Sequence, residues 1–137
     1  MNGMRGASLH HELVVRTEDR IGLLGEITRL LSDVGLSLVA LTVRVQDGVA
    51  TLHLLTDAQF YARDALQGAG FLVDEREVIL IELPDHPGFL CRVTEALARK
   101  EIAIEELYST VFAGSSKGLV VFTTTHNGKA VQMLRKH

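Results

Sequence analysis

The chain has 137 residues, of which 47% are apolar and 23% charged, and its formal net charge at pH 7 is −3. This composition excludes a mainly disordered chain, and the negative charge argues against nucleic-acid binding. A single cysteine excludes an internal disulfide and a cysteine-rich zinc site. Because no apolar run reaches membrane-spanning length and the first residues lack the apolar core of a secretory signal, we expect a cytoplasmic protein that does not bind membranes.

The first predicted elements are a strand at 12–17 and a helix that opens at Gly22, after a turn at Asp19 or Arg20. The helix carries one apolar stripe with spacings of three and four residues, and Gly35 ends it in a left-handed conformation. The stripe comprises Leu23, Leu24, Ile27, Leu30, Leu31 and Val34.

A hairpin follows, with strands at 37–45 and 49–55 joined by the tight turn Asp47-Gly48. Asp57 is expected to cap a second helix, which the glycines of 68–70 terminate. A fourth strand begins at 71–73. The first half of the chain therefore predicts the order strand, helix, strand, strand, helix, strand.

The second half repeats this order. With an offset of 66 residues, 19–24 falls on 85–90, and past residue 47 the offset becomes 70, so that Gly48 falls on Gly118. The repeat predicts a helix with a stripe of four apolar residues, a hairpin of 104–112 and 118–125, and a last helix at 129–135 capped by Asn127. The stripe comprises Phe89, Leu90, Val93 and Leu97.

We therefore expect an α+β fold, a ferredoxin-like βαββαβ unit repeated twice, with antiparallel sheets and helices on one face. The domains are predicted at 10–75 and 76–137, joined by a continuous strand. The second domain has its fourth strand missing or supplied from elsewhere. The strand at 37–43 has no charge, so at a sheet edge it would pair with the other copy or another subunit. These two features predict at least a homodimer.

The second copy resembles the strand, Asp-x-Pro-Gly, helix signature of ACT domains, with Asp85, Pro87 and Gly88 in the expected places. The first copy keeps Asp19 and Gly22 but has Ile21 in place of proline. The resemblance covers about residues 10 to 135, and within the family the chain is similar to stand-alone two-domain proteins without an attached enzyme. It implies a non-catalytic regulatory protein that binds a small molecule, an amino acid by expectation, and needs no cofactor.

The turn also has a physical reason to hold a ligand. A glycine lets a ligand approach the backbone, and the first N–H groups of a helix lack internal partners and favour a carboxylate. The expected ligand-binding residues at the two turns are Asp19, Gly22, Leu23, Leu24, Asp85, His86, Pro87, Gly88, Phe89 and Leu90. The resemblance implies that the ligand sits between two domains and also touches the strand after the first helix, at Ser37, Leu38 and Ile104. The alternative is that the glycines serve packing alone and the aspartates serve as N-caps alone.

Two other functions are open. The chain could be a regulatory subunit that docks on an amino-acid biosynthetic enzyme through the uncharged strand. More remotely, it could be a thiol enzyme using Cys91, because the first turn of a helix favours a thiolate. Neighbours on one turn seldom align as nucleophile and base, so Asp85 and His86 support that reading weakly. His10 and His11 point to opposite faces of a strand, and no metal site is predicted.

Overall fold

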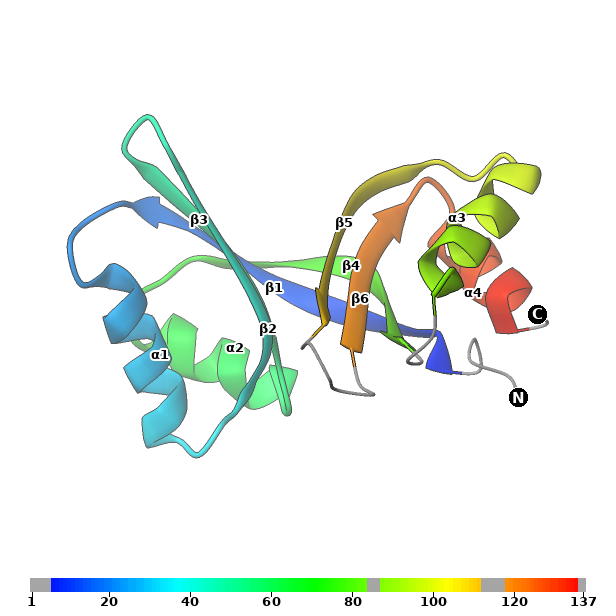
Figure 1. The fold of residues 1–137 in the computed structure, drawn as a ribbon. Coiled ribbons are helices and arrows are strands. Elements are labelled where there is room, and N and C mark those ends of the chain that lie inside the picture. Colours follow the sequence, from blue (N-terminus) through cyan, green and yellow to red (C-terminus); the bar gives the residue numbers. More distant parts are fainter. Residues whose placement is uncertain (1–5, 84–86, 112–117, 136–137) are drawn as a thin grey trace. The chain divides into compact units, whose positions relative to one another are not determined.

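A computed structural model describes residues 6–83, 87–111 and 118–135, which form two compact units (Figure 1). One unit comprises His11–Arg76, and the other comprises Met1–His10 together with Glu77–His137. We call them the 11–76 unit and the 77–137 unit. Both combine antiparallel strands with helices, which confirms the predicted α+β, ferredoxin-like fold class. Among the described residues, no helix is long and apolar enough to cross a membrane.

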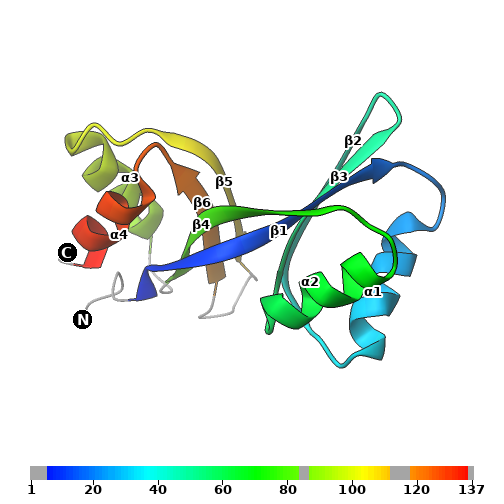
Figure 2. The same cartoon turned by 180° about the vertical axis from the view of Figure 1, so that it is seen from behind.

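The first six elements follow the predicted order of strands and helices. They are β1 (Ser8–Glu18), α1 (Leu23–Asp33), β2 (Leu38–Gln46), β3 (Val49–Thr56), α2 (Gln59–Gly68) and β4 (Val73–Leu83). In the 11–76 unit the strands lie in the order β2-β3-β1-β4, and β3 pairs antiparallel with both neighbours. Figures 1 and 2 show α1 and α2 on the same side of these strands.

The core of the 11–76 unit lies between its helices and one face of its strands, because alternate strand residues point to that face. Its buried residues are Leu13, Val15, Leu23, Ile27, Leu31, Ala50, Leu52, Leu54, Ala62 and Leu66. Two members of the predicted stripe on α1 do not join this core, since Leu24 is 41% exposed and Val34 is 55% exposed. The predicted stripe is therefore correct except for Leu24 and Val34, which face solvent.

The 77–137 unit contains the later part of β4 and then α3 (Phe89–Arg99), β5 (Ile104–Val111), β6 (Gly118–Thr124) and α4 (Asn127–Arg135). Its strands β4, β6 and β5 lie side by side in that order and are antiparallel. The stripe of α3 is confirmed, because Phe89, Val93 and Leu97 are buried and Leu90 packs against the same core.

The start of the chain belongs to the 77–137 unit. Ala7 is buried in the core of that unit, and the Arg135 Nε donates a hydrogen bond of 2.9 Å to the Ala7 carbonyl. The strand that begins next, β1, is the neighbour of β4 on the side away from β6. The chain's own first residues therefore hold the place where a fourth strand of the second repeat would lie. The missing strand gives no further reason to expect a second subunit.

The end of the first repeat runs into the second without a linker, as predicted, because Val73–Leu83 is one continuous strand. The tight turn is also confirmed. Asp47 and Gly48 have φ angles of 52° and 76°, as a type I′ hairpin turn requires. Gly35, with a φ of 77°, ends α1 in the left-handed conformation.

The two predicted side-chain caps are wrong. The residue that caps α2 is Ala58, and the Asp57 carboxylate instead accepts a 3.0 Å hydrogen bond from the Ser37 amide. Asn127 is the first residue of α4, and its side-chain oxygen accepts from the amide of Thr124 at 2.7 Å, one turn earlier in the chain. Asp57 therefore ties the segment before α2 to the residue before β2, and Asn127 ties the start of α4 to the end of β6.

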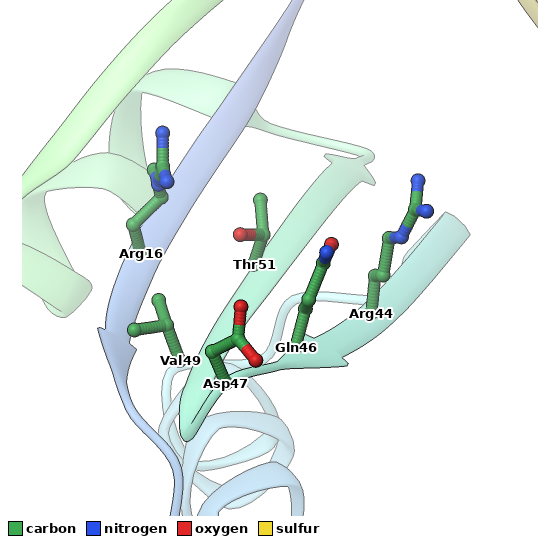
Figure 3. Close-up of a pocket in the computed structure, with 6 residues that line it drawn as sticks. All are labelled: Arg16, Arg44, Gln46, Asp47, Val49 and Thr51. Atoms are coloured by element: carbon green, nitrogen blue, oxygen red, sulfur yellow. The ribbon is translucent and has the colours of Figure 1, made fainter.

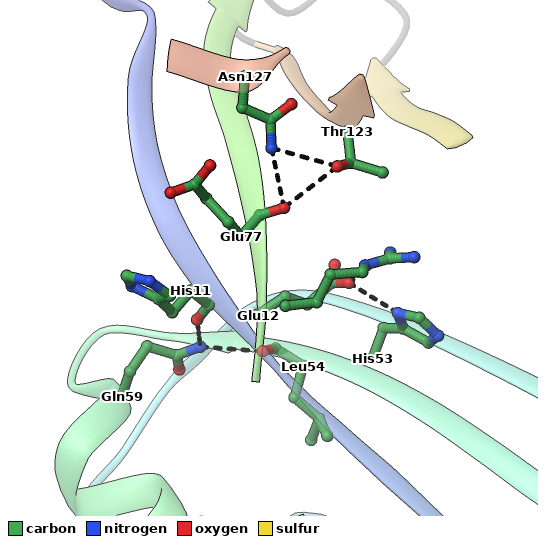
Figure 4. A network of polar contacts seen from close by, with 9 residues as sticks. His11, Glu12, His53, Leu54, Gln59, Glu77, Thr123 and Asn127 are labelled. Atoms are coloured by element: carbon green, nitrogen blue, oxygen red, sulfur yellow. Dashed lines mark hydrogen bonds and ion pairs between the residues drawn. The ribbon is translucent and has the colours of Figure 1, made fainter. Parts of the chain in front are cut away.

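The side chain that corresponds to Asn127 in the first repeat is Gln59. Its oxygen accepts from the amide of Thr56 at 2.8 Å, and its nitrogen donates to the carbonyl of His11, as the Asn127 nitrogen donates to the carbonyl of Glu77. Figure 4 shows the contacts of the two side-chain nitrogens with the carbonyls of His11 and Glu77. The repeat therefore extends to matched polar contacts between residues of different type.

These contacts also correct the alignment of the repeats. Leu54 lies opposite Leu41, and Phe122 lies opposite Leu107. The third strands of the two repeats therefore correspond at an offset of 68, and the predicted offset of 70, which aligned Gly48 with Gly118, is wrong. The place expected for the extra residues, 113–116, lies outside the described residues.

Candidate functional site

The two glycines of the predicted turns have the same conformation. Gly22 precedes α1 with φ 87° and ψ −2°, and Gly88 precedes α3 with φ 87° and ψ −3°. This left-handed region favours glycine strongly. A Cβ at either glycine would meet no atom of the described chain within 4 Å. Packing is therefore not the reason for the glycines, and each leaves the start of its helix open to approach.

The first amides of both helices do not take part in the helical hydrogen-bond pattern. In α1 the first such bond runs from the Glu26 amide to the Gly22 carbonyl, at 2.9 Å, and in α3 it runs from the Arg92 amide to the Gly88 carbonyl, at 3.0 Å. Among the amides before these donors, that of Leu23 donates to the Arg20 carbonyl at 3.2 Å, whereas those of Leu24, Gly25, Leu90 and Cys91 have no acceptor within their own helix. They carry the positive end of the helix dipole, so a carboxylate would be favoured at both places.

No side chain caps α1, so the alternative in which Asp19 serves only as its N-cap is wrong. The Asp19 amide instead donates to the Gly48 carbonyl at 2.9 Å, which ties this turn to the hairpin of β2 and β3. Beside the turn, Arg20 and Glu26 form an exposed ion pair. Asp85 and His86 lie outside the described residues.

The apolar residues at the turns differ in what they can offer a ligand. Leu23 and Phe89 are each 3% exposed and belong to the cores, so their side chains are not accessible to a ligand. Leu24 is 41% exposed, while Leu90 is half-buried. Pro87 is exposed.

The strand residues expected in the site lie at the other end of each first helix. Ser37 and Leu38 follow α1 and are exposed, whereas Ile104 follows α3 and packs partly against the core. A helix of 11 residues is about 16 Å long. One small ligand therefore cannot touch the turn and the strand start of the same repeat.

Cys91 is a free, exposed cysteine. Its Sγ lies 3.4 Å from the Glu95 carboxylate, and this hydrogen bond, with the negative charge of Glu95, raises the pKa of the thiol. The expectation that its place in the helix favours a thiolate is therefore wrong, because Glu95 acts in the opposite direction. In the described part of the chain no group of three histidine, cysteine or acidic residues is placed to hold a metal ion.

One pocket was not predicted from the sequence. It has a volume of about 260 Å³ and lies by the hairpin of β2 and β3 (Figure 3). Its lining residues are Arg16, Arg44, Gln46, Asp47, Val49 and Thr51. The predicted turn at Asp47-Gly48 is enough to place Arg44 opposite Thr51. The pairing of Arg16 with Thr51 could not be predicted, because it joins strands that are distant in the chain.

Comparisons with known proteins support the fold described above. The sequence matches the family described as "ACT domain pair" over residues 9–136. The structure is similar to the crystal structure of protein BT0572 from Bacteroides thetaiotaomicron, with 25% identity and a TM-score of 0.86, covering 96% of this chain and 90% of that one. It is also similar to the regulatory subunit of aspartate kinase from Thermus thermophilus in its ligand-free form. There the identity is 16%, the TM-score is 0.62, and 96% of each chain is covered. No curated protein matches the sequence.

Proposed function

The chain belongs to the ACT domain pair family, whose members are regulatory rather than catalytic, and we propose that it is a non-catalytic sensor of a small amino acid. The observation that carries this proposal is the shared geometry of Gly22 and Gly88. Each glycine holds an open backbone at the start of a helix, where the carboxylate of an amino acid gains hydrogen bonds and a favourable dipole.

We propose that each ligand touches a helix start of one domain and the strand after the first helix of another. In support of this, the helix start and the start of the following strand lie about 16 Å apart within one repeat. The proposed ligand-binding residues in the described chain are Gly22, Leu23, Leu24, Ser37, Leu38, Pro87, Gly88, Phe89, Leu90 and Ile104. Asp19, Asp85 and His86 complete the proposed set, with the carboxylates as partners for the ligand's ammonium group.

A thermal-denaturation survey against the twenty amino acids tests this function. A ligand present at 100 times its Kd stabilises the folded protein by about 2.7 kcal/mol. For a chain of this length we expect the melting temperature to rise by several degrees with one amino acid or a few related ones. If no amino acid raises the melting temperature at millimolar concentration, the proposed function is wrong.

The strand β2 favours assembly with another chain. It lies at the end of the strand order, and β3 is its one strand neighbour among the described residues. Val39, Val43 and Val45 on this strand are 47%, 41% and 52% exposed. An unprotected apolar edge of this kind pairs readily with another strand. We propose a homodimer, with docking on an amino-acid biosynthetic enzyme as the alternative.

Light scattering at micromolar concentration is expected to give the mass of a dimer for the natural chain and of a monomer for Val43→Lys. Pairing of β2 with a second chain would bury the lysine, which disfavours strand pairing. Phe60→Lys is the matched control, since Phe60 is also exposed and apolar but lies on α2, and it should remain dimeric. A monomeric natural chain contradicts the homodimer. Stoichiometric co-purification with a metabolic enzyme would then favour the alternative.

A further inference from the structure

Two arginines flank a threonine on one face of the 11–76 unit. Thr51 on β3 lies opposite Arg16 of β1 on one side and opposite Arg44 of β2 on the other. Residues directly opposite in adjacent strands share a face, and successive residues of a strand alternate between faces. Because Val15 and Leu52 are buried in the core, the row of Arg16, Thr51 and Arg44 points to the face away from the helices.

The row carries two positive charges that form no ion pair with the described residues. Both arginines are exposed. By contrast, Arg20, Arg63 and Arg76 each pair with a glutamate. The intervening strand holds the Cα atoms of the two arginines about 10 Å apart, which is within reach of two long side chains that converge on one small ion.

The surroundings of the row form a half-open pocket. Figure 3 shows the six lining side chains on the same side of the strands, with Thr51 between the arginines and Asp47 at the hairpin end. The volume of about 260 Å³ suits a small ligand. The polar groups that line it are two guanidinium forks, the Thr51 hydroxyl, the amide of Gln46 and the carboxylate of Asp47.

We propose that this pocket binds a phosphate dianion, either free or as the end group of a phosphorylated metabolite. A guanidinium fork donates two parallel hydrogen bonds to oxygens of one phosphate, and a tetrahedral dianion has enough oxygens to engage both forks and the Thr51 hydroxyl at once. The site uses neither helix start of the proposed amino-acid site. It therefore gives the protein a second ligand of different chemistry.

Titration of inorganic phosphate and of phenyl phosphate into the full chain at low ionic strength tests the proposal, with amide chemical shifts as the readout. Arg16→Gln and Arg44→Gln should each weaken binding about tenfold, because each removes a charge-assisted hydrogen-bond pair. Thr51→Val should weaken it by a smaller factor. Asp47→Asn should tighten it, since it removes a negative charge at a position where asparagine also adopts the positive φ.

Arg29→Gln is the matched control, because it makes the same change in net charge at an exposed residue of α1. It should alter phosphate affinity less than twofold. The proposal is overturned if Arg29→Gln weakens binding as much as Arg16→Gln does, since the effect would then be one of net charge. It is also overturned if Asp47→Asn weakens phosphate binding, since the Asp47 carboxylate should repel the dianion, or if phosphate binding does not saturate. Tighter binding of phenyl phosphate identifies a phosphorylated metabolite, and equal binding identifies phosphate itself.

Discussion

Replacing Glu12 by alanine is expected to lower the free energy of unfolding by about 3 kcal/mol. The Glu12 side chain is fully buried, and its carboxylate accepts hydrogen bonds of 2.7 Å from both the His53 Nδ1 and an Arg76 guanidinium nitrogen (Figure 4 shows the histidine contact). Breaking a buried ion pair by removing one partner costs about 3–5 kcal/mol. We expect the lower end of this energy range because the Arg76 side chain is 31% exposed to water.

Chemical denaturation measures this effect, and Glu75→Ala gives a matched control. Glu75 pairs with Arg63 at 3.1 Å, but both side chains are more than a third exposed, so the loss should be below about 1 kcal/mol. Glu12→Gln keeps the shape and the hydrogen-bond acceptor, and it should fall between the two alanine variants. Equal losses for Glu12→Ala and Glu75→Ala would show that the buried contacts of Glu12 do not stabilise the fold.

Replacing Gly88 by alanine is expected to weaken amino-acid binding at least tenfold while the protein stays folded. The φ of 87° is strained for a residue with a Cβ and costs about 1–2 kcal/mol of stability. No described atom blocks that Cβ, so the fold tolerates it. In the ligand-bound state, however, the Cβ would stand where the ligand approaches the helix amides. Gly22→Ala tests the first turn in the same way.

Gly88→Asn separates conformation from ligand access. Asparagine adopts positive φ more readily than alanine, so this variant should lose less stability in denaturation experiments. Calorimetry should nevertheless find its amino-acid affinity reduced as much as that of Gly88→Ala, because both side chains begin with a Cβ. If Gly88→Asn binds as tightly as the natural chain, the glycine serves the turn conformation alone.

Much of the fold could be predicted because its signals are local. The stripe on α3, the hairpin turn at Asp47-Gly48 and the continuous strand β4 each depend on residues close together in the chain. The caps at Asp57 and Asn127 were predicted by the same local reasoning and are wrong. Their side chains bond to Ser37, just before β2, and to Thr124, at the end of β6, and Asp57 reaches a residue twenty positions away in the sequence.

The candidate site was predictable in part for the same reason. The glycines at positions 22 and 88 could be singled out from the sequence next to each predicted helix, but their positive φ angles were not predicted. The contacts of Glu12 with His53 and Arg76 could not be predicted, because they need the register between strands that are far apart in the chain. A glutamate within a predicted strand looks like a surface residue until its neighbours are known.

The most direct test of the proposed sensor is a map of backbone amide chemical shifts as an amino acid found in the thermal survey is added. The amides of Leu24, Gly25, Leu90 and Cys91, which precede the first helical hydrogen bonds, should show the largest saturable changes. Such a result would place the carboxylate at the helix starts. Binding that leaves these four amides unchanged would contradict a ligand site at the glycine turns.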